Sequence, residues 1–252
     1  MLVHGLAEHA GRYKHLVQRL LDAGYVVYGH DHRGFGKSGG IRGHWERFDD
    51  VIDDMHRVVA HARQNWPKLP LGMFAHSMGA VIGVHYMYRH PQEFKAAVLS
   101  SPGFGAGPQQ DKLLILFLPL GNKIIPRKPL KRKEYEYALS HAPGEEEAWN
   151  NDPLVHPYST PRWGVIYLKA AKEAKALLAK LAVPILVIMG EEDVTVSRQA
   201  IREAVAAAGP NVTFYTYAGA YHEVHNELPE IRNAMLADTL HWLEENLAAT
   251  SG

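Results

Sequence analysis

The sequence predicts an α/β domain with a mostly parallel sheet and helices on both of its faces. Short apolar runs bounded by turn residues alternate along the chain with segments whose apolar residues recur at helical spacing. The runs are continuously apolar, as expected for strands that are buried on both faces of a parallel sheet. A length of 252 residues suits one domain of this class, with or without an insertion.

The expected strands are apolar runs with glycine, proline or serine near one end. In chain order they are residues 25–28, 71–75, 96–99, 184–189 and 212–217. Apolar residues at helical spacing predict helices over 51–62, 81–89 and 231–243. Asp49 and Asp50 favour a helix start just before the first of these, because acidic side chains stabilise the N-terminal end of a helix.

One long segment interrupts this alternation. Residues 103–161 contain many prolines, an apolar stretch from Leu113 to Leu120 and a basic run from Lys128 to Lys133. A structureless loop of this length is uncommon in a compact domain. We therefore expect a core domain made of 1–102 and 162–252, with residues 103–161 inserted as a cap. The basic run predicts a solvated face of the cap, and attraction to an anionic lipid surface is the alternative.

Composition and charge exclude several classes of protein. Lysine and arginine total 27, as do aspartate and glutamate, so the formal net charge is zero and no nucleic-acid partner is expected. The absence of cysteine excludes disulfides, a thiolate zinc site and a cysteine nucleophile. No signal peptide is visible, and the longest apolar stretch is far shorter than the roughly 20 residues of a membrane span. These features predict a cytoplasmic protein.

A candidate nucleophile lies where an expected strand meets an expected helix. Residues 74–80 read FAHSMGA, which is close to the G-x-S-x-G pattern of a nucleophile elbow centred on Ser77. Small neighbours are needed there because the tight turn brings backbone against backbone. Ala75 stands where the pattern has its first glycine. A serine that only caps the following helix is the alternative interpretation.

A serine nucleophile requires a base and an acid that orients it. In this type of sheet they follow later strands in the order serine, acid, histidine. Asp193 follows the strand expected at 184–189, and His222 follows the strand expected at 212–217. The alternatives for the acid are Glu191 and Glu192, and the alternative base is His225.

An oxyanion hole requires two backbone N–H groups directed at the developing negative charge. Met78 provides one candidate, because it follows the nucleophile at a helix start where N–H groups lack partners. The second donor is expected in the loop after an early strand, and Leu6 in the sequence His4-Gly5-Leu6 stands at that place.

Four segments together resemble a known family. They read HGLAEHAGRY at 4–13, DHRGFGKS at 31–38, NDPL at 151–154 and GAYHEVH at 219–225. These segments are similar to the motifs of monoacylglycerol lipases and their lysophospholipase-like relatives, in the same order along the chain. The resemblance implies an α/β-hydrolase fold, a helical cap and a cofactor-free hydrolase of single-chain acyl esters.

The sequence departs from this family in two places. Ala75 replaces the usual glycine of the elbow, which concerns the strain of the turn more than the chemistry. Family members also carry further residues before the His-Gly motif, which form the first strands of the sheet, whereas only Met1, Leu2 and Val3 precede it here. We expect these N-terminal strands to be missing, either because the chain is truncated or because its sheet is smaller with an open edge.

The resemblance also implies residues that bind the polar head of the substrate. Glu8, Arg12 and His225 match family positions that contact glycerol, and His76 and Trp149 are further candidates for substrate binding. An ordinary ion pair between Glu8 and Arg12 is the alternative.

Other sites are not expected. Gly36-Lys37-Ser38 resembles the end of a phosphate-binding loop, but that motif needs a glycine where Asp31 stands. The histidines at 30 and 32, or at 222 and 225 with Glu227, lack a metalloprotease spacing, so no metal is expected.

We therefore expect a serine ester hydrolase that cleaves monoacylglycerols to glycerol and fatty acid through an acyl-serine intermediate. The alternatives are a lysophospholipase or short-chain carboxylesterase, or, in another class, a non-catalytic ligand-binding member of the fold. The expected partner is a small acyl ester. Because the expected cap is apolar, transient and peripheral contact with a lipid interface is also possible. The oligomeric state does not follow from the sequence.

Overall fold

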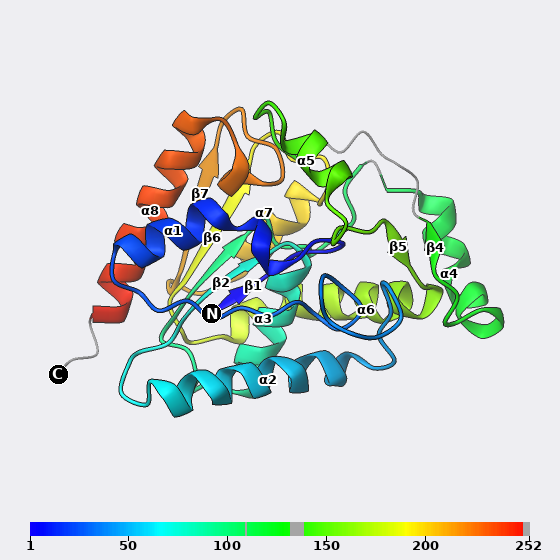
Figure 1. The fold of residues 1–252 in the computed structure, drawn as a ribbon, viewed down its shortest axis with the longest axis horizontal. Helices are drawn as coiled ribbons and strands as arrows, with labels where there is room; N and C mark the ends of the chain where they lie inside the picture. Colours follow the sequence, from blue (N-terminus) through cyan, green and yellow to red (C-terminus); the bar gives the residue numbers. More distant parts are fainter. Residues whose placement is uncertain (109, 132–138, 249–252) are drawn as a thin grey trace.

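The computed structural model describes residues 1–108, 110–131 and 139–248, and it contains one central parallel sheet flanked by helices (Figure 1). The strand order is β1-β2-β3-β6-β7, and every pairing in this sheet is parallel. The strands are β1 (Leu2–Val3), β2 (Gly72–His76), β3 (Ala96–Ser100), β6 (Ile185–Gly190) and β7 (Val212–Tyr217). The α/β class is confirmed.

The two faces of the sheet are covered by different helices. Their bounds are α1 (Lys14–Asp22) and α8 (Pro229–Ala248) on one face, and α2 (Phe48–Asn65), α3 (Met78–Arg89), α6 (Pro161–Leu177) and α7 (Arg198–Ala206) on the other. Strand β2 serves both cores, because Met73 and Ala75 pack toward α3 while Phe74 packs toward α8. This alternation is the two-residue period of a strand.

The structure agrees with most of the expected elements. Strands β3 and β7 and helices α2, α3 and α8 cover the ranges expected from the sequence, and β2 and β6 each begin one residue later than expected. The strand expected at 25–28 is wrong. This segment makes one isolated bridge, between Gly29 and Leu2, and a 2.7 Å hydrogen bond from Leu2 N to Tyr28 O. A strand requires a neighbour to pair with, and the neighbour of this segment, β1, is only two residues long, so no ladder of hydrogen bonds forms.

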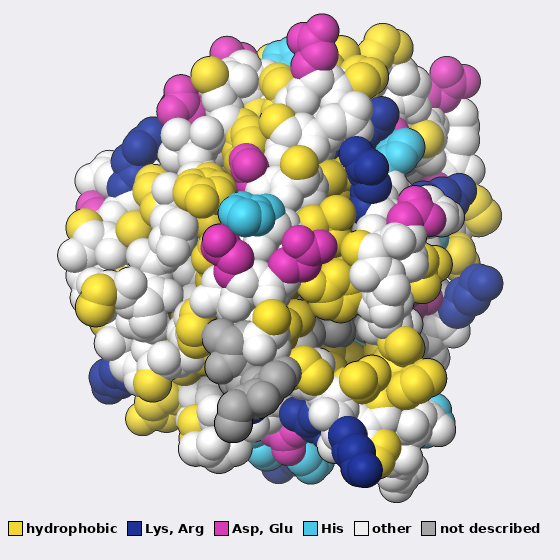
Figure 2. All heavy atoms as spheres, turned by 90° about the vertical axis from the view of Figure 1, so that its left-hand side faces the viewer, with side chains coloured by type: hydrophobic (Ala, Val, Ile, Leu, Met, Phe, Trp, Pro, Cys, Tyr) yellow, Lys and Arg dark blue, Asp and Glu magenta, His cyan; other side chains and the backbone are white. Residues whose placement is uncertain are grey.

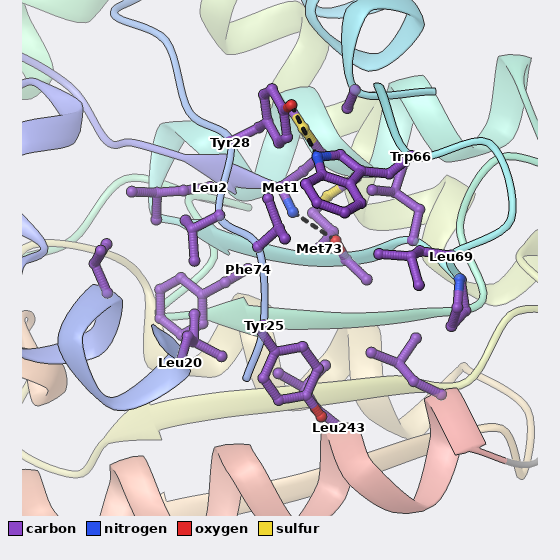
Figure 3. A pocket seen from close by; sticks show the side chains of 18 of the residues that line it. Met1, Leu2, Leu20, Tyr25, Tyr28, Trp66, Leu69, Met73, Phe74 and Leu243 are labelled. Atoms are coloured by element: carbon purple, nitrogen blue, oxygen red, sulfur yellow. Dashed lines mark hydrogen bonds between the residues drawn. The ribbon is translucent and has the colours of Figure 1, made fainter. Parts of the chain in front are cut away.

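The β1 edge of the sheet adjoins an apolar cavity of about 270 Å³. Figure 2 faces this side of the molecule, where hydrophobic side chains gather around a hollow. The Met1 amino group donates to Gly72 O over 2.7 Å, and Trp66 Nε1 donates to the Tyr28 hydroxyl over 3.2 Å (Figure 3). No candidate catalytic residue lines this cavity.

The segment expected to form the cap, residues 103–161, lies between β3 and α6, and its described part gathers at one end of the molecule (Figure 1). It contains α4 (Lys112–Ile124), β4 (Leu130–Lys131), α5 (Glu145–Asn151) and β5 (Tyr158–Ser159). Strands β4 and β5 form an antiparallel pair, so the cap is helical with a small strand pair added. Of the basic run, Arg132 and Lys133 lie outside the described residues. None of the helices in the described part of the chain combines the length and hydrophobicity needed to span a membrane.

Candidate active site

Ser77 lies in a sharp turn between β2 and α3. Its backbone has φ 52° and ψ −115°, a conformation that costs a residue with a side chain about 1–3 kcal/mol. Space around the turn is small: a Cβ added to Gly79 would overlap the carbonyl oxygens of Val3 and His4. The turn therefore requires glycine at position 79 and exposes the serine at the carboxyl end of the sheet.

Ala75, the departure from the elbow pattern, is fully buried beneath α3. Its Cβ lies 3.4 Å from the place that a Cβ on Gly83 would occupy, and that added Cβ would also lie 2.6 Å from the Met73 sulfur. Glycine at position 83 therefore makes room chiefly for the Met73 side chain, and the Ala75 methyl group lies beside it at ordinary contact distance.

Ser77, His222 and Asp193 form one hydrogen-bonded chain. His222 Nε2 lies 3.0 Å from Ser77 Oγ, and His222 Nδ1 lies 2.7 Å from Asp193 Oδ2. The other Asp193 oxygen accepts the N–H groups of Thr195 and Val196 at 2.8 and 3.1 Å. Since a carboxylate can only accept, Nδ1 of His222 carries the proton and Nε2 is free to accept the proton of the serine.

The charge of Asp193 also sets the basicity of His222. Burial lowers the pKa of His222, but the charge and hydrogen bond of Asp193, together with the charges of Glu223 and Glu8, more than offset burial and raise that pKa above its usual value. His222 is thus a stronger proton acceptor than an isolated imidazole.

The alternative acids and base have other surroundings. Glu191 accepts the Thr216 hydroxyl at 2.8 Å, and Glu192 lies 3.7 Å from His141. His225 stacks on the Tyr13 ring with the centroids 4.6 Å apart, and neither of its ring nitrogens has a hydrogen-bond partner among the described residues. Within the described chain, Asp193 and His222 are the pair that reaches Ser77.

The loop from His4 to Leu6 packs directly against the elbow. A Cβ added to Gly5 would lie 3.3 Å from Ser77 Cβ, so the backbone here passes beside the nucleophile. The Leu6 N–H has no acceptor among the described residues. Met78 is the first residue of α3, where an N–H has no acceptor inside the helix. Both expected oxyanion donors are therefore unengaged.

Two buried histidines hold this loop in place. His4 Nε2 accepts the His32 N–H at 2.9 Å, and the His32 ring donates to His4 O at 3.1 Å. Burial lowers the pKa of His4 to about 3, so its ring is neutral and its Nδ1 donates to Gly5 O at 2.8 Å. Asp31 adds a further anchor by accepting the N–H groups of Ala10 and Lys37. The sequence motifs had not revealed these roles.

The expected head-group residues form a buried charge network. Glu8 accepts Gly5 N at 2.5 Å and the Tyr13 hydroxyl at 2.6 Å. Arg12 lies 3.4 Å from Glu8 but bonds more closely to Glu223, over 2.6 and 3.0 Å. The Arg12 guanidinium also lies over the Trp149 ring, 4.4 Å from its centroid. The Glu8–Arg12 ion pair, the alternative interpretation from the sequence, is therefore part of a larger network centred on Arg12.

A cavity of about 560 Å³ opens at Ser77. The expected site residues that line it are Leu6, Glu8, His76, Ser77, Trp149 and His222. Arg12 and His225 do not line it, so direct contact with a head group, expected for both, is not supported by their positions. Glu223 does line it and was missed in the sequence, where it stands beside the candidate base as a charged residue in a glycine-bounded loop.

The cap and the core supply different parts of this cavity. Leu114, Ile115 and Leu118 of α4 contribute an apolar wall together with residues of α6. His76 lies beside the base, with ring centroids 4.7 Å apart, and burial lowers its pKa well below the usual value. Among the described residues, no three metal-ligating side chains come together.

Comparisons with known proteins agree with this geometry. The family described as "Serine aminopeptidase, S33" matches residues 1–229. A monoacylglycerol lipase of Mycolicibacterium smegmatis is 36% identical over 98% of this chain and 88% of the relative, and a monoglyceride lipase of Rattus norvegicus is 31% identical over 97% and 82%. The solved monoacylglycerol lipase of Paleococcus ferrophilus superposes with a TM-score of 0.88 at 26% identity, covering 97% of this chain and 93% of that one.

Proposed function

Because the chain belongs to the S33 serine hydrolase family, we propose that it is an esterase that cleaves monoacylglycerols to glycerol and a fatty acid. The observation that carries this proposal is the hydrogen-bonded chain from Ser77 through His222 to Asp193 at the mouth of a largely apolar cavity. The names of relatives that align over nearly the whole chain support the substrate class.

In the proposed mechanism Ser77 Oγ attacks the ester carbonyl while His222 Nε2 accepts its proton. Asp193 holds the imidazole in the required tautomer and stabilises the imidazolium that forms. The N–H groups of Leu6 and Met78 stabilise the oxyanion, each by about 3 kcal/mol. His222 then gives the proton to the departing glycerol oxygen and afterwards activates the water that releases the fatty acid.

We propose that the cap, residues 103–161, holds the acyl chain. Leu114, Ile115 and Leu118 line the cavity from above, and a cavity of about 560 Å³ falls in the usual range for a lipid-sized ligand. Asp152 anchors the cap to the core by bonding His9 over 2.8 Å. The rest of α4 packs along α6.

The outer face of α4 supports transient contact with a lipid interface. Leu116 is 72% exposed and Phe117 is 55% exposed. Leu113, Leu120 and Ile124 extend the same apolar surface. Contiguous exposed apolar side chains of this extent usually mark an interaction site. We propose that α4 meets the surface from which the substrate is extracted.

The proposal is tested by labelling and by a substrate panel. A fluorophosphonate probe should label Ser77 in the wild-type protein, and the Ser77→Ala variant should remain unlabelled. The wild-type protein should also hydrolyse monoacylglycerol faster than diacylglycerol, lysophospholipid or a nitrophenyl ester. Labelling without hydrolysis of any ester would contradict the proposed reaction, and the absence of labelling would favour a non-catalytic binding protein.

A further inference from the structure

Two carboxylates line the cavity beside the loops that carry the expected oxyanion donor and the expected base. Glu8 follows the oxyanion residue Leu6, and Glu223 directly follows His222, whose Nε2 must protonate the leaving oxygen. The apolar wall from α4 lies in the cap and suits the acyl chain. An ester whose acyl chain lies against this wall would have its alcohol close to Glu8 and Glu223.

The cation that partners these carboxylates does not line the cavity. Arg12 donates hydrogen bonds to both carboxylate oxygens of Glu223 and lies 3.4 Å from Glu8. Its side chain is only 7% exposed. Among the described residues it is the one cation within ion-pair distance of either carboxylate. A third carboxylate, Glu145, lies 3.6 Å behind it and outside the cavity lining. The network thus sets three carboxyl groups around one guanidinium.

The other cations of the cavity come from different elements. Lys131 belongs to β4 of the cap and Lys172 to α6, whereas Glu8 and Glu223 belong to the two loops that carry the oxyanion donor and the base. A negatively charged alcohol beside these two loops would face their carboxylate oxygens. A hydroxyl group, in contrast, can donate to them, and Glu8 Oε2 has only its long contact with Arg12.

We propose that Glu8 and Glu223 make the site select esters whose alcohol is neutral or cationic and reject esters whose alcohol carries a phosphate. This rests on the proposed function, because it assigns specificity within the same cavity. Selection of this kind works by repulsion, since bringing like charges together in a desolvated site is costly.

The charge of Glu223 persists at neutral pH. Burial alone would raise the pKa of Glu223, but the charge and the hydrogen bonds of Arg12 together hold it at about 2. Burial raises the pKa of Glu8 to about 7, and the neighbouring Glu223 carboxylate contributes to that rise. Glu223 is therefore the more constant source of repulsion, and it is the residue to test.

The test compares three esters that share one octanoyl chain and differ in the alcohol. The alcohols are glycerol, glycerol 3-phosphate and choline, and all three esters are used as monomers, so that the charge of an aggregate does not enter. For the wild-type protein we expect kcat/KM to be at least about tenfold lower for the phosphate ester than for the glycerol ester, with the choline ester accepted. Glu223→Gln should raise the phosphate-to-glycerol ratio by about tenfold.

Glu145→Gln is the matched control, because it removes a carboxylate that contacts Arg12 outside the cavity. It should change the ratio by less than about threefold. An equal rate of the wild-type protein on the glycerol and phosphate esters, which needs no variant, or a ratio that Glu223→Gln leaves unchanged, overturns the inference while the proposed function stands. A wild-type protein that cleaves none of the three esters overturns the proposed function and the inference with it.

Discussion

The Arg12 guanidinium donates hydrogen bonds to both carboxylate oxygens of Glu223, the residue that directly follows His222 in the chain. This pairing joins two loops that are 211 residues apart in sequence. One loop carries the expected oxyanion donor and the other carries the expected base. This buried ion pair therefore helps to fix the relative position of the two groups.

Replacing Arg12 by alanine should destabilise the protein and slow hydrolysis of every ester. Removal of one partner of a buried pair leaves the other charge uncompensated, which costs about 3–5 kcal/mol in the free energy of unfolding. Since Arg12 does not line the cavity, kcat/KM for a glycerol ester and for a nitrophenyl ester should fall by similar factors.

Urea unfolding and the two rate constants check this prediction, with Arg47→Ala as the control, because the Arg47 side chain is exposed and paired only on the surface. A loss of activity confined to the glycerol ester would instead support direct contact between Arg12 and the head group, as the family resemblance implied.

The Ser77→Ala, His222→Ala and Asp193→Asn variants should each lose activity without unfolding. In comparable triads, loss of the nucleophile or the base lowers kcat by about 10⁶, and mistuning of the acid lowers it by about 10⁴. Steady-state kinetics on a soluble ester measures these losses, and circular dichroism verifies the fold. His225→Phe is the control, because it keeps the stack on Tyr13. An inactive His225→Phe together with a normally active His222→Ala would mean that the base has been assigned to the wrong histidine.

The positions of four of the five strands expected from the sequence, and of the candidate triad residues after them, were predictable because they follow from local patterns. Continuous apolar runs such as 184–189 form strands wherever neighbours are available, and the loops after them meet at one edge of a parallel sheet. The segment 25–28 shows the limit of this reasoning, because its composition suits a strand but its neighbour β1 is too short to pair with it.

The head-group residues were less predictable because their partners are distant in the chain. Spacing along the sequence suggested that Arg12 pairs with Glu8, but the closer partner is Glu223, and no local pattern connects the two. His225 follows the base by three residues, as a helical turn would require. Its ring nevertheless packs on Tyr13 and away from the cavity lining, which only the folded arrangement of the two loops decides.

Ala75→Gly should leave catalysis within a few-fold of wild type and lower stability. The variant restores the usual elbow residue but removes a buried methyl group and frees the backbone of a strand, each worth about 1 kcal/mol. Thermal unfolding and kcat on a soluble ester check the two effects. The comparison variant is Gly83→Ala, which should be more damaging because its Cβ would lie 2.6 Å from the Met73 sulfur. A large gain in kcat for Ala75→Gly would show that the methyl group strains the nucleophile.

Polar substitution on the two sides of α4 should have different effects. Leu116→Ser alters the exposed face and should slow hydrolysis of vesicle-borne monoacylglycerol, while a soluble short-chain ester is unaffected. Ile115→Asn alters the cavity wall and should slow long-chain esters in any physical state. Leu69→Ser is the control, because Leu69 is also exposed but belongs to the separate cavity at the β1 edge of the sheet. Equal losses on all substrates for Leu116→Ser would favour simple packing of the cap on the core.

His225→Phe should make the protein more resistant to acid. Burial lowers the pKa of His225 to about 4, so between its ordinary pKa of 6.5 and about 4 the unfolded state binds a proton that the folded state does not. Stability from this group is therefore present above 6.5 and is lost as the pH falls toward 4, by about 2 kcal/mol between pH 7 and pH 5. Phenylalanine cannot take up the proton, and it leaves no unpaired ring nitrogen in the core.

Urea unfolding at pH 7 and pH 5 should show a smaller loss of stability for His225→Phe than for the wild type. The control His241→Gln, at an exposed surface position, should match the wild type. Identical pH dependence in His225→Phe and wild type would mean that His225 is already protonated, or already solvated, in the folded protein.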